Sequence, residues 1–201
     1  MGGGSVFSTY FKFGMDHILE FGAMDHILFV ITLCVSFRIN DYKKILTLVT
    51  AFTIGHSVTL ALSSFKIISY PVIITETAIP FTIIITAVLN SIRKTEENRV
   101  KTFDRTLWMN YALACVFGMV HGMGFASSFR FLLGTDHILM QLFAFSLGIE
   151  AAQLIIVAVF MLCYFGMIKY IKIPQKEFKI FICGAAFGVS VLLLFKVWEL
   201  I

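Results

Sequence analysis

Charged residues are scarce in this chain of 201 residues, because Asp, Glu, Lys and Arg together make up only 14% of it. A soluble domain usually carries about 25% charged residues. Here 59% of the residues are hydrophobic and the mean hydropathy is +0.90. This composition excludes a soluble domain and predicts an integral membrane protein in contact with a lipid bilayer. The net charge of +4 is no argument for a nucleic-acid partner, since the basic residues fall in short segments between apolar runs.

Several other features are absent. The four cysteines lie inside apolar runs without paired spacing, which argues against a disulfide framework and against a CxxC metal site. The N-terminus lacks a basic segment followed by an uninterrupted apolar stretch and a small-residue cleavage site, so no signal peptide is expected. The apolar runs also lack the alternating pattern of barrel strands, which argues against a transmembrane β-barrel.

Six continuous apolar runs are present, and each is long enough to cross about 30 Å of hydrocarbon as a helix. They lie near 15–37, 43–64, 71–91, 108–129, 137–165 and 178–200. The fold class predicted from these runs is all-α: a bundle of six transmembrane helices that forms one integral membrane domain over residues 1–201.

Basic residues predict the orientation of this bundle. Twelve of the sixteen follow the first, third and fifth runs: Arg38, Lys43, Lys44, Arg93, Lys94, Arg99, Lys101, Arg105, Lys169, Lys172, Lys176 and Lys179. By the positive-inside rule these segments are cytoplasmic, and both termini are expected outside. The chain is therefore predicted to be a multi-pass protein of a bacterial inner membrane.

Ionisable residues inside the apolar runs are the strongest functional signal, because each costs several kcal/mol in hydrocarbon unless it is paired, bound to metal or facing a cavity. They are Asp25, His26, His56, His121 and Glu150. At 1.5 Å per helical residue, both His56 and His121 lie about 20 Å from the cytoplasmic boundary. Asp25 and Glu150 lie about 15 to 20 Å below the outer boundary, so all five are expected to meet in the outer half of the membrane.

Glu76 is expected to join this group from about 8 Å below the outer boundary. Pro80 removes the hydrogen bond that the Glu76 carbonyl would accept in a regular helix. A carbonyl oxygen without a partner is therefore expected beside the carboxylate, where a cation or a water molecule could bind to it.

Imidazole and carboxylate groups that converge in this way predict a site for a divalent transition metal. His17, with Asp16 beside it, is expected near the outer edge as part of a vestibule. Gln153 shares a helix face with Glu150, and Ser57 follows His56, so these two are candidates to support the ligands. A hydroxyl at position 57 could equally bond to its own helix.

Four segments also carry a family resemblance: residues 17–29 (HILEFGAMDHILF), 52–60 (FTIGHSVTL), 117–126 (FGMVHGMGFA) and 145–153 (FSLGIEAAQ). Taken together and in this order, they resemble the HupE/UreJ family of hydrogenase- and urease-associated membrane proteins. The resemblance implies a small permease for nickel or cobalt. It also implies a polar signature that falls on His17, Asp25, His26, His56, Glu76, His121 and Glu150 of this chain.

The sequence thus predicts transport, most simply uptake, of a divalent metal ion such as nickel or cobalt. Zinc, iron and copper stay open as the ion, and so does homo-oligomer formation. A second class of function also stays open: a membrane-embedded metalloenzyme that uses the same ion for hydrolysis or redox chemistry. A third is a sensor or scaffold whose ion never exchanges.

Overall fold

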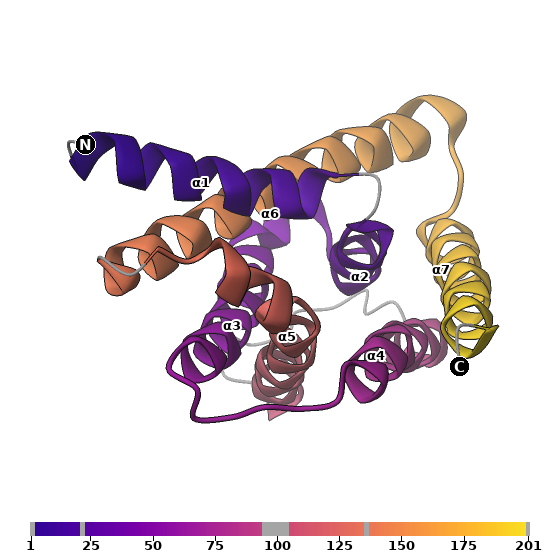
Figure 1. Cartoon of the computed structure of the whole chain (residues 1–201). Helices are drawn as coiled ribbons and strands as arrows, with labels where there is room; N and C mark the ends of the chain where they lie inside the picture. Colours follow the sequence, from indigo (N-terminus) through magenta and orange to yellow (C-terminus); the bar gives the residue numbers. More distant parts are fainter. Residues whose placement is uncertain (1–2, 21–22, 94–104, 135–136, 200–201) are drawn as a thin grey trace.

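The computed structural model describes residues 3–20, 23–93, 105–134 and 137–199, and every regular element within these ranges is helical (Figure 1). The all-α prediction is thereby confirmed. The α-helices in these ranges are α1 (Gly3–Leu19), α2 (Met24–Cys34), α3 (Tyr42–Ser64), α4 (Val72–Ile92), α5 (Arg105–Leu132), α6 (Ile138–Gly166) and α7 (Gln175–Glu199). A short 3-10 helix, η2 (Ile39–Asp41), precedes α3, and a π-helical turn, η3 (Met167–Ile171), continues α6.

Within the described ranges, α3, α4, α5, α6 and α7 are each long and apolar enough to cross a membrane. The helix pair α1 and α2 passes the same test only if the two are counted together. The chain is therefore a multi-pass membrane protein with five such helices, or six with the bent pair. α6 and η3 together run for 34 residues, about 50 Å, which exceeds the hydrocarbon thickness and requires the helix to tilt or to project.

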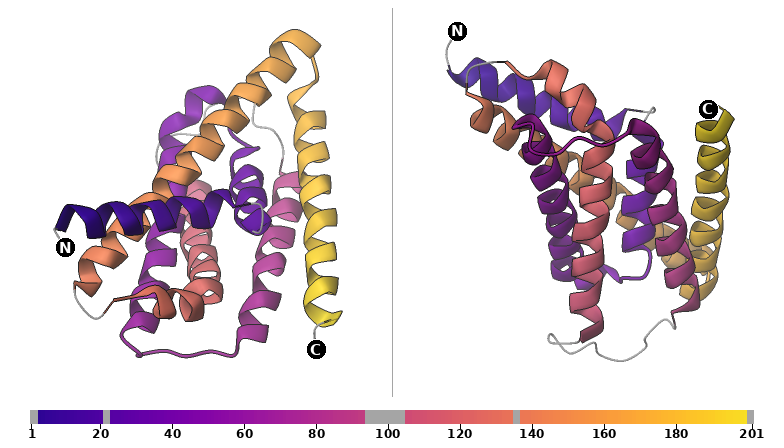
Figure 2. Two further views of the ribbon diagram at one scale, coloured as in Figure 1. Left: turned by 45° about the horizontal axis from the view of Figure 1, so that its top comes forward. Right: turned by 60° about the horizontal axis from the view of Figure 1, so that its bottom comes forward.

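The first apolar run differs from the single straight span expected at 15–37. It is divided between the end of α1 and the whole of α2, and these two helices meet at an angle of 75°. α2 has only 11 residues, about 16 Å, or roughly half of the hydrocarbon core. α1 lies crosswise over one end of the bundle (Figure 2, right). The break places the last turn of α1 beside the first turn of α2.

Glycines allow two pairs of helices to approach closely. On α3 and α5, a β-carbon at Gly55 would overlap the carbonyl oxygen of Cys115, and one at Gly118 would overlap that of Phe52. On α1 and α6, a β-carbon at Gly148 would overlap the carbonyl oxygen of Phe11. Backbone contact of this kind fixes the relative depth of neighbouring helices. It therefore sets the positions of the side chains that α1, α3 and α5 contribute to the interior.

Side chains also tie the two ends of the bundle together. At the end covered by α1, the Tyr10 hydroxyl donates to the carbonyl of Leu132 at 2.7 Å. At the opposite end, the Lys179 ammonium donates to the carbonyl of Arg93, which joins the start of α7 to the end of α4. This second end carries the basic segments of the sequence. Of the basic residues predicted to be cytoplasmic, Lys94, Arg99 and Lys101 lie outside the described residues.

Candidate metal centre

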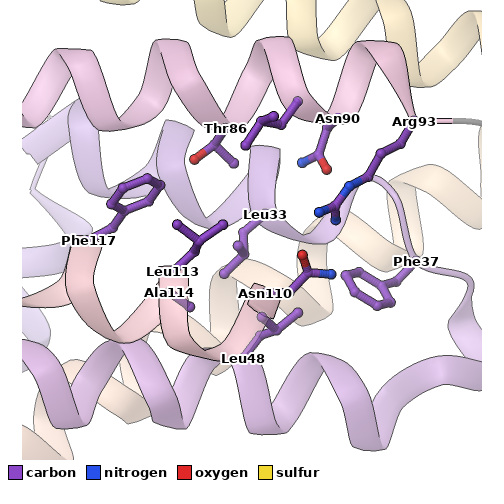
Figure 3. Close-up of a pocket in the computed structure, with 11 residues that line it drawn as sticks. Leu33, Phe37, Leu48, Thr86, Asn90, Arg93, Asn110, Leu113, Ala114 and Phe117 are labelled. Atoms are coloured by element: carbon purple, nitrogen blue, oxygen red, sulfur yellow. The ribbon is translucent and has the colours of Figure 1, made fainter. Parts of the chain in front are cut away.

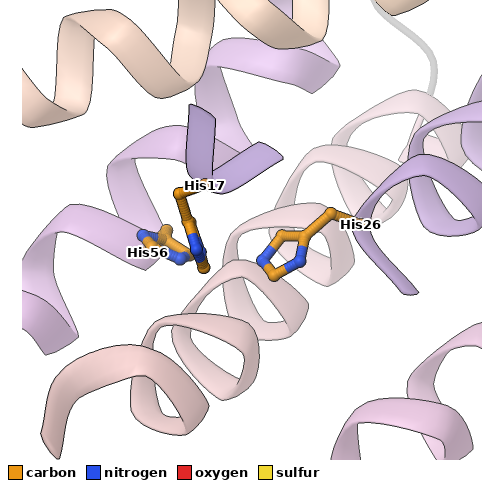
Figure 4. A group of neighbouring side chains, drawn as sticks. All are labelled: His17, His26 and His56. Carbon is orange, nitrogen blue, oxygen red and sulfur yellow. The ribbon is translucent and has the colours of Figure 1, made fainter. Parts of the chain in front are cut away.

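Four histidines from four helices come together at the end of the bundle that α1 covers. His17 comes from the last turn of α1, His26 from the first turn of α2, His56 from α3 and His121 from α5. The ring centres of His17 and His26 are 4.9 Å apart, and those of His26 and His121 are 5.0 Å apart. His56 lies 5.9 Å from both His17 and His26. Figure 4 shows the rings of His17, His26 and His56 turned toward one another.

These side chains form two overlapping groups that could each hold a metal ion. In the outer triad, ligand atoms of His17, His26 and His56 all lie within 4.8 Å of one another. In the inner triad, the same holds for Asp25, His26 and His121. His26 belongs to both. Bonds of about 2.1 Å to one ion would require small side-chain rotations from this spacing.

The ring nitrogens of this cluster are the clearest sign that it binds something. His26 is 4% exposed, and His56 and His121 are 0% exposed. No hydrogen-bond partner within the described part of the chain reaches Nε2 of His17, Nε2 of His26, Nδ1 of His121 or either ring nitrogen of His56. An unpaired buried polar atom costs about 1 to 3 kcal/mol, and several of them rarely gather without a ligand. A divalent cation would satisfy them together, because neutral imidazole is a good ligand for it.

Asp25 orients the shared ligand. Its carboxylate oxygen lies 3.1 Å from Nδ1 of His26, so Nδ1 donates to Asp25 and Nε2 keeps its lone pair for a metal ion. Asp25 also lies in the first turn of α2, where the helix dipole favours a carboxylate. His17 lies in the last turn of α1, where the dipole favours a bound cation. The broken first span therefore supplies two helix ends that both suit metal binding.

Thr82 of α4 orients His121. The Thr82 hydroxyl donates its only hydrogen to the carbonyl of Ile79 at 2.7 Å. Its oxygen also lies 3.0 Å from Nε2 of His121 and must accept a hydrogen bond there. Nε2 of His121 therefore carries the proton, and the bare lone pair lies on Nδ1, the nitrogen that has no other partner.

Aromatic side chains wall the cluster. The ring of Phe125 stacks on His17 at 3.8 Å between centres and on Phe145 at 5.5 Å. On the other side, Phe29 and Phe52 lie 5.0 and 5.2 Å from His121. Such walls exclude water and fix ring orientations, which strengthens electrostatic interactions inside the cluster.

Glu150 and its expected companions lie along the contact between α3 and α6 instead of at the imidazoles. Glu150 accepts a hydrogen bond of 2.6 Å from Thr50, and the Gln153 carbonyl accepts one of 2.9 Å from Thr53. Ser57 donates to Ser146 at 2.7 Å. Glu150 is in neither triad. Its carboxylate has a partner from a neighbouring helix, and this accounts for a charged group within an apolar run.

Glu76 lies apart from the imidazoles as well. Its neighbours Thr75, Ile79, Thr82 and Ile83 form the buried face of α4, whereas Glu76 is exposed. Successive helical residues point about 100° apart, so a carboxylate one position after Thr75 turns off that face. The depth estimate carried no information about the direction of the Glu76 side chain.

Thr82 is the residue of the candidate site that the sequence did not single out. It is one of many threonines in the chain, and only the later repetition of polar side chains at Thr86 and Asn90 marks its helix face. The stacking partners of the histidines were equally hard to select among 22 phenylalanines.

Comparison with known proteins gives one match. Neither the curated proteins nor the solved structures contain a match to the chain. The model of the family described as HupE / UreJ protein matches residues 2–199, which is nearly the whole chain and includes both triads. The chain belongs to the HupE / UreJ protein family.

Proposed function

We propose that this protein transports a divalent transition-metal ion, nickel or cobalt, across a bacterial inner membrane, in the direction of uptake. The observation that carries the proposal is the pair of triads that share His26. Family membership supports a role connected with nickel or cobalt. Imidazole and carboxylate ligands suit either ion.

The orientation follows from the basic residues. Arg38, Lys43 and Arg93 lie at the end of the bundle opposite α1, and by the positive-inside rule this end faces the cytoplasm. The cluster lies nearer the other end: His56 is 14 residues after the start of α3 but only eight before its end. The histidines are therefore placed in the outer half of the membrane.

In this orientation the ion meets the outer triad first. This triad includes His17, the ligand on α1, and α1 is the helix that covers the outer end. The ion passes from His17 and His56 to His121 while His26 stays bound through Nε2, and Asp25 continues to hold Nδ1 of His26. Each transfer exchanges only part of the ligand set, so the ion is never without protein ligands in the apolar interior.

The deciding experiment measures binding and movement in the same preparation. Purified protein is titrated with Ni²⁺ and Co²⁺, and is then reconstituted into liposomes that contain a metal-sensitive dye. His56→Ala and His121→Ala are each expected to lower affinity at least about tenfold and to reduce flux in proportion. His137→Ala is the matched control, because His137 is an exposed histidine at the start of α6 and lies in neither triad.

Two results would contradict the proposal. If both ligand variants bind and move the ions as well as the His137 variant does, the cluster is not the transport site. If the parent protein binds the ions tightly but moves none, the cluster holds its metal for another purpose, such as chemistry within the membrane.

A further inference from the structure

An open cavity lies between α2, α3, α4 and α5, on the side of the histidines that faces the basic end of the bundle (Figure 3). The space that the centres of water molecules can occupy in it is about 30 Å³, enough for one or two of them, and all the empty space is about 400 Å³ when the open mouth is included. It contains none of the residues of the two triads. Phe37, Arg93 and Asn110 line it close to the helix ends, and Thr86 and Phe117 line it deeper in the bundle.

The cavity ends one helical turn from the inner triad on two separate helices. On α5, Phe117 lines the cavity and precedes His121 by four residues. On α4, Thr86 lines the cavity and follows Thr82, the partner of His121, by four residues. Four residues correspond to about 6 Å along a helix. The inner triad and the cavity are therefore about one side chain apart.

A layer of aromatic rings fills that distance. Phe29 and Phe52 are fully buried, and their ring centres are 4.9 Å apart. The ring of Phe117 lies 6.0 Å from Phe29. Of these three side chains, Phe117 is the one that also lines the cavity. Rotation of the Phe117 ring would therefore open the cavity toward this aromatic layer.

Polar side chains of α4 present hydrogen-bond acceptors to the cavity. Thr86 donates its hydroxyl hydrogen to the carbonyl of Thr82 at 2.7 Å. The Asn90 amide nitrogen donates to the carbonyl of Thr32 at 2.7 Å. Each side chain thus donates a hydrogen bond to a backbone carbonyl. The lone pairs of the Thr86 hydroxyl and the Asn90 side-chain carbonyl are left to accept hydrogen bonds from a ligand. Water bound to a cation donates hydrogen bonds, and oxygen atoms of this kind receive them.

We propose that this cavity is the cytoplasmic half of the route for the metal ion, and that the ion gains its first water molecules there when the ring of Phe117 turns aside. This proposal rests on the transport function proposed above. Thr82, Thr86 and Asn90 stand at successive turns of α4, so one helix face runs from the inner triad to the mouth.

Arg93 places a positive charge at the mouth of this route (Figure 3). A unit charge about 7 Å away in a water-filled mouth changes the local concentration of a monovalent ion by about two- to threefold. A cationic reagent should therefore reach the cavity faster in Arg93→Gln than in the parent, and an anionic reagent should reach it more slowly. This charge dependence gives a readout of the cavity that does not involve metal.

The test uses a parent in which alanine replaces Cys34, Cys115, Cys163 and Cys183. Thr86→Cys in this parent is treated, in oriented proteoliposomes, with a membrane-impermeant thiosulfonate from the side of the basic segments. Ile83→Cys is the matched control, because Ile83 is fully buried on the same helix and does not line the cavity. Asn110→Cys repeats the test from α5 and serves if Thr86→Cys does not fold.

Thr86→Cys is expected to react at least tenfold faster than Ile83→Cys, and only from that side. Complete modification should lower Ni²⁺ flux at least tenfold and leave Ni²⁺ affinity unchanged, because the triads lie beyond Phe117. Phe117→Ala should raise flux severalfold in the unmodified protein. Ni²⁺ binding by each variant verifies that it is folded.

The contrary results distinguish failure of the proposed transport function from failure of the proposed exit route. If the cysteine-free parent moves no Ni²⁺, the transport function fails and the exit route fails with it. If the parent moves Ni²⁺ and fully modified Thr86→Cys and Asn110→Cys move it equally well, the exit route alone is wrong. The same conclusion follows if neither cysteine reacts from the basic side.

Discussion

Replacing Thr82 by valine should weaken metal binding although Thr82 itself is no ligand. Valine keeps nearly the same volume but removes the oxygen that accepts the hydrogen bond from Nε2 of His121. Thr82 is 5% exposed, so water cannot readily replace that oxygen. The ring must then either leave a buried N–H unpaired or move its proton to Nδ1, the nitrogen expected to bind the ion.

The first alternative costs about 1 to 3 kcal/mol. The second alternative leaves Nδ1 of His121 unable to bind the ion until the proton returns to Nε2. Both lower the affinity, and loss of a partner that orients a ligating histidine typically costs ten- to a hundredfold. That factor corresponds to about 1.4 to 2.7 kcal/mol, within the range for the unpaired N–H. We therefore expect Thr82→Val to raise the dissociation constant for Ni²⁺ ten- to a hundredfold and Thr82→Ser to restore it.

Calorimetric titration of the purified protein with Ni²⁺ measures this change. Thr86→Val is the matched control, because Thr86 lies one turn away and its hydroxyl also donates to a backbone carbonyl. Nitrogen NMR of labelled histidine should show His121 protonated at Nε2 in the parent and altered in Thr82→Val. If Thr82→Val binds Ni²⁺ within twofold of the parent, or if Thr86→Val loses as much affinity, Thr82 does not set the state of His121.

Three further substitutions test other parts of the site and the fold. Asp25→Asn should weaken Ni²⁺ binding ten- to a hundredfold by calorimetry, because the carboxylate that orients His26 loses its charge, whereas the exposed Asp16→Asn should bind like the parent. Glu150→Gln can still accept from Thr50, so its Ni²⁺ affinity should stay within twofold, and a tenfold loss would mean that Glu150 is a ligand after all. Gly55→Ala should lower the thermal unfolding temperature because its β-carbon meets the α5 backbone, whereas Gly184→Ala meets nothing within 4 Å and should leave it unchanged or raise it.

The sequence alone singled out the residues of the two triads because burial of charge is costly. An imidazole such as His56 or His121 in an apolar run needs a compensating partner, and counting residues along each helix is enough to compare depths. The same count of residues could not predict the direction in which each side chain points. Glu76 points off the buried face of α4, and Glu150 finds Thr50 on a neighbouring helix.

The sequence pattern did not indicate the break between α1 and α2. The run at 15–37 is long and apolar enough for one span. Between Leu19 and Met24, only Glu20 and Gly22 interrupt its apolar, helix-compatible pattern. A single glycine costs about 1 kcal/mol in a helix and does not by itself end one. Packing decides the outcome, because Gly14 lies against the backbone of α6 and holds α1 crosswise. That crosswise path brings His17 into the cluster.

The two triads differ in how firmly their ligands are held, and this difference bears on direction. In the inner triad, Asp25 orients His26 and Thr82 orients His121. In the outer triad, neither ring nitrogen of His56 has a partner within the described residues. Ligands that are oriented in advance lose less entropy on binding and so bind more tightly. Affinity should therefore increase from the outer to the inner triad, which favours loading from the side of α1. In the proposed route, release depends on the aromatic layer at Phe117, one turn before His121 on α5, and we expect this step to limit the rate of transport.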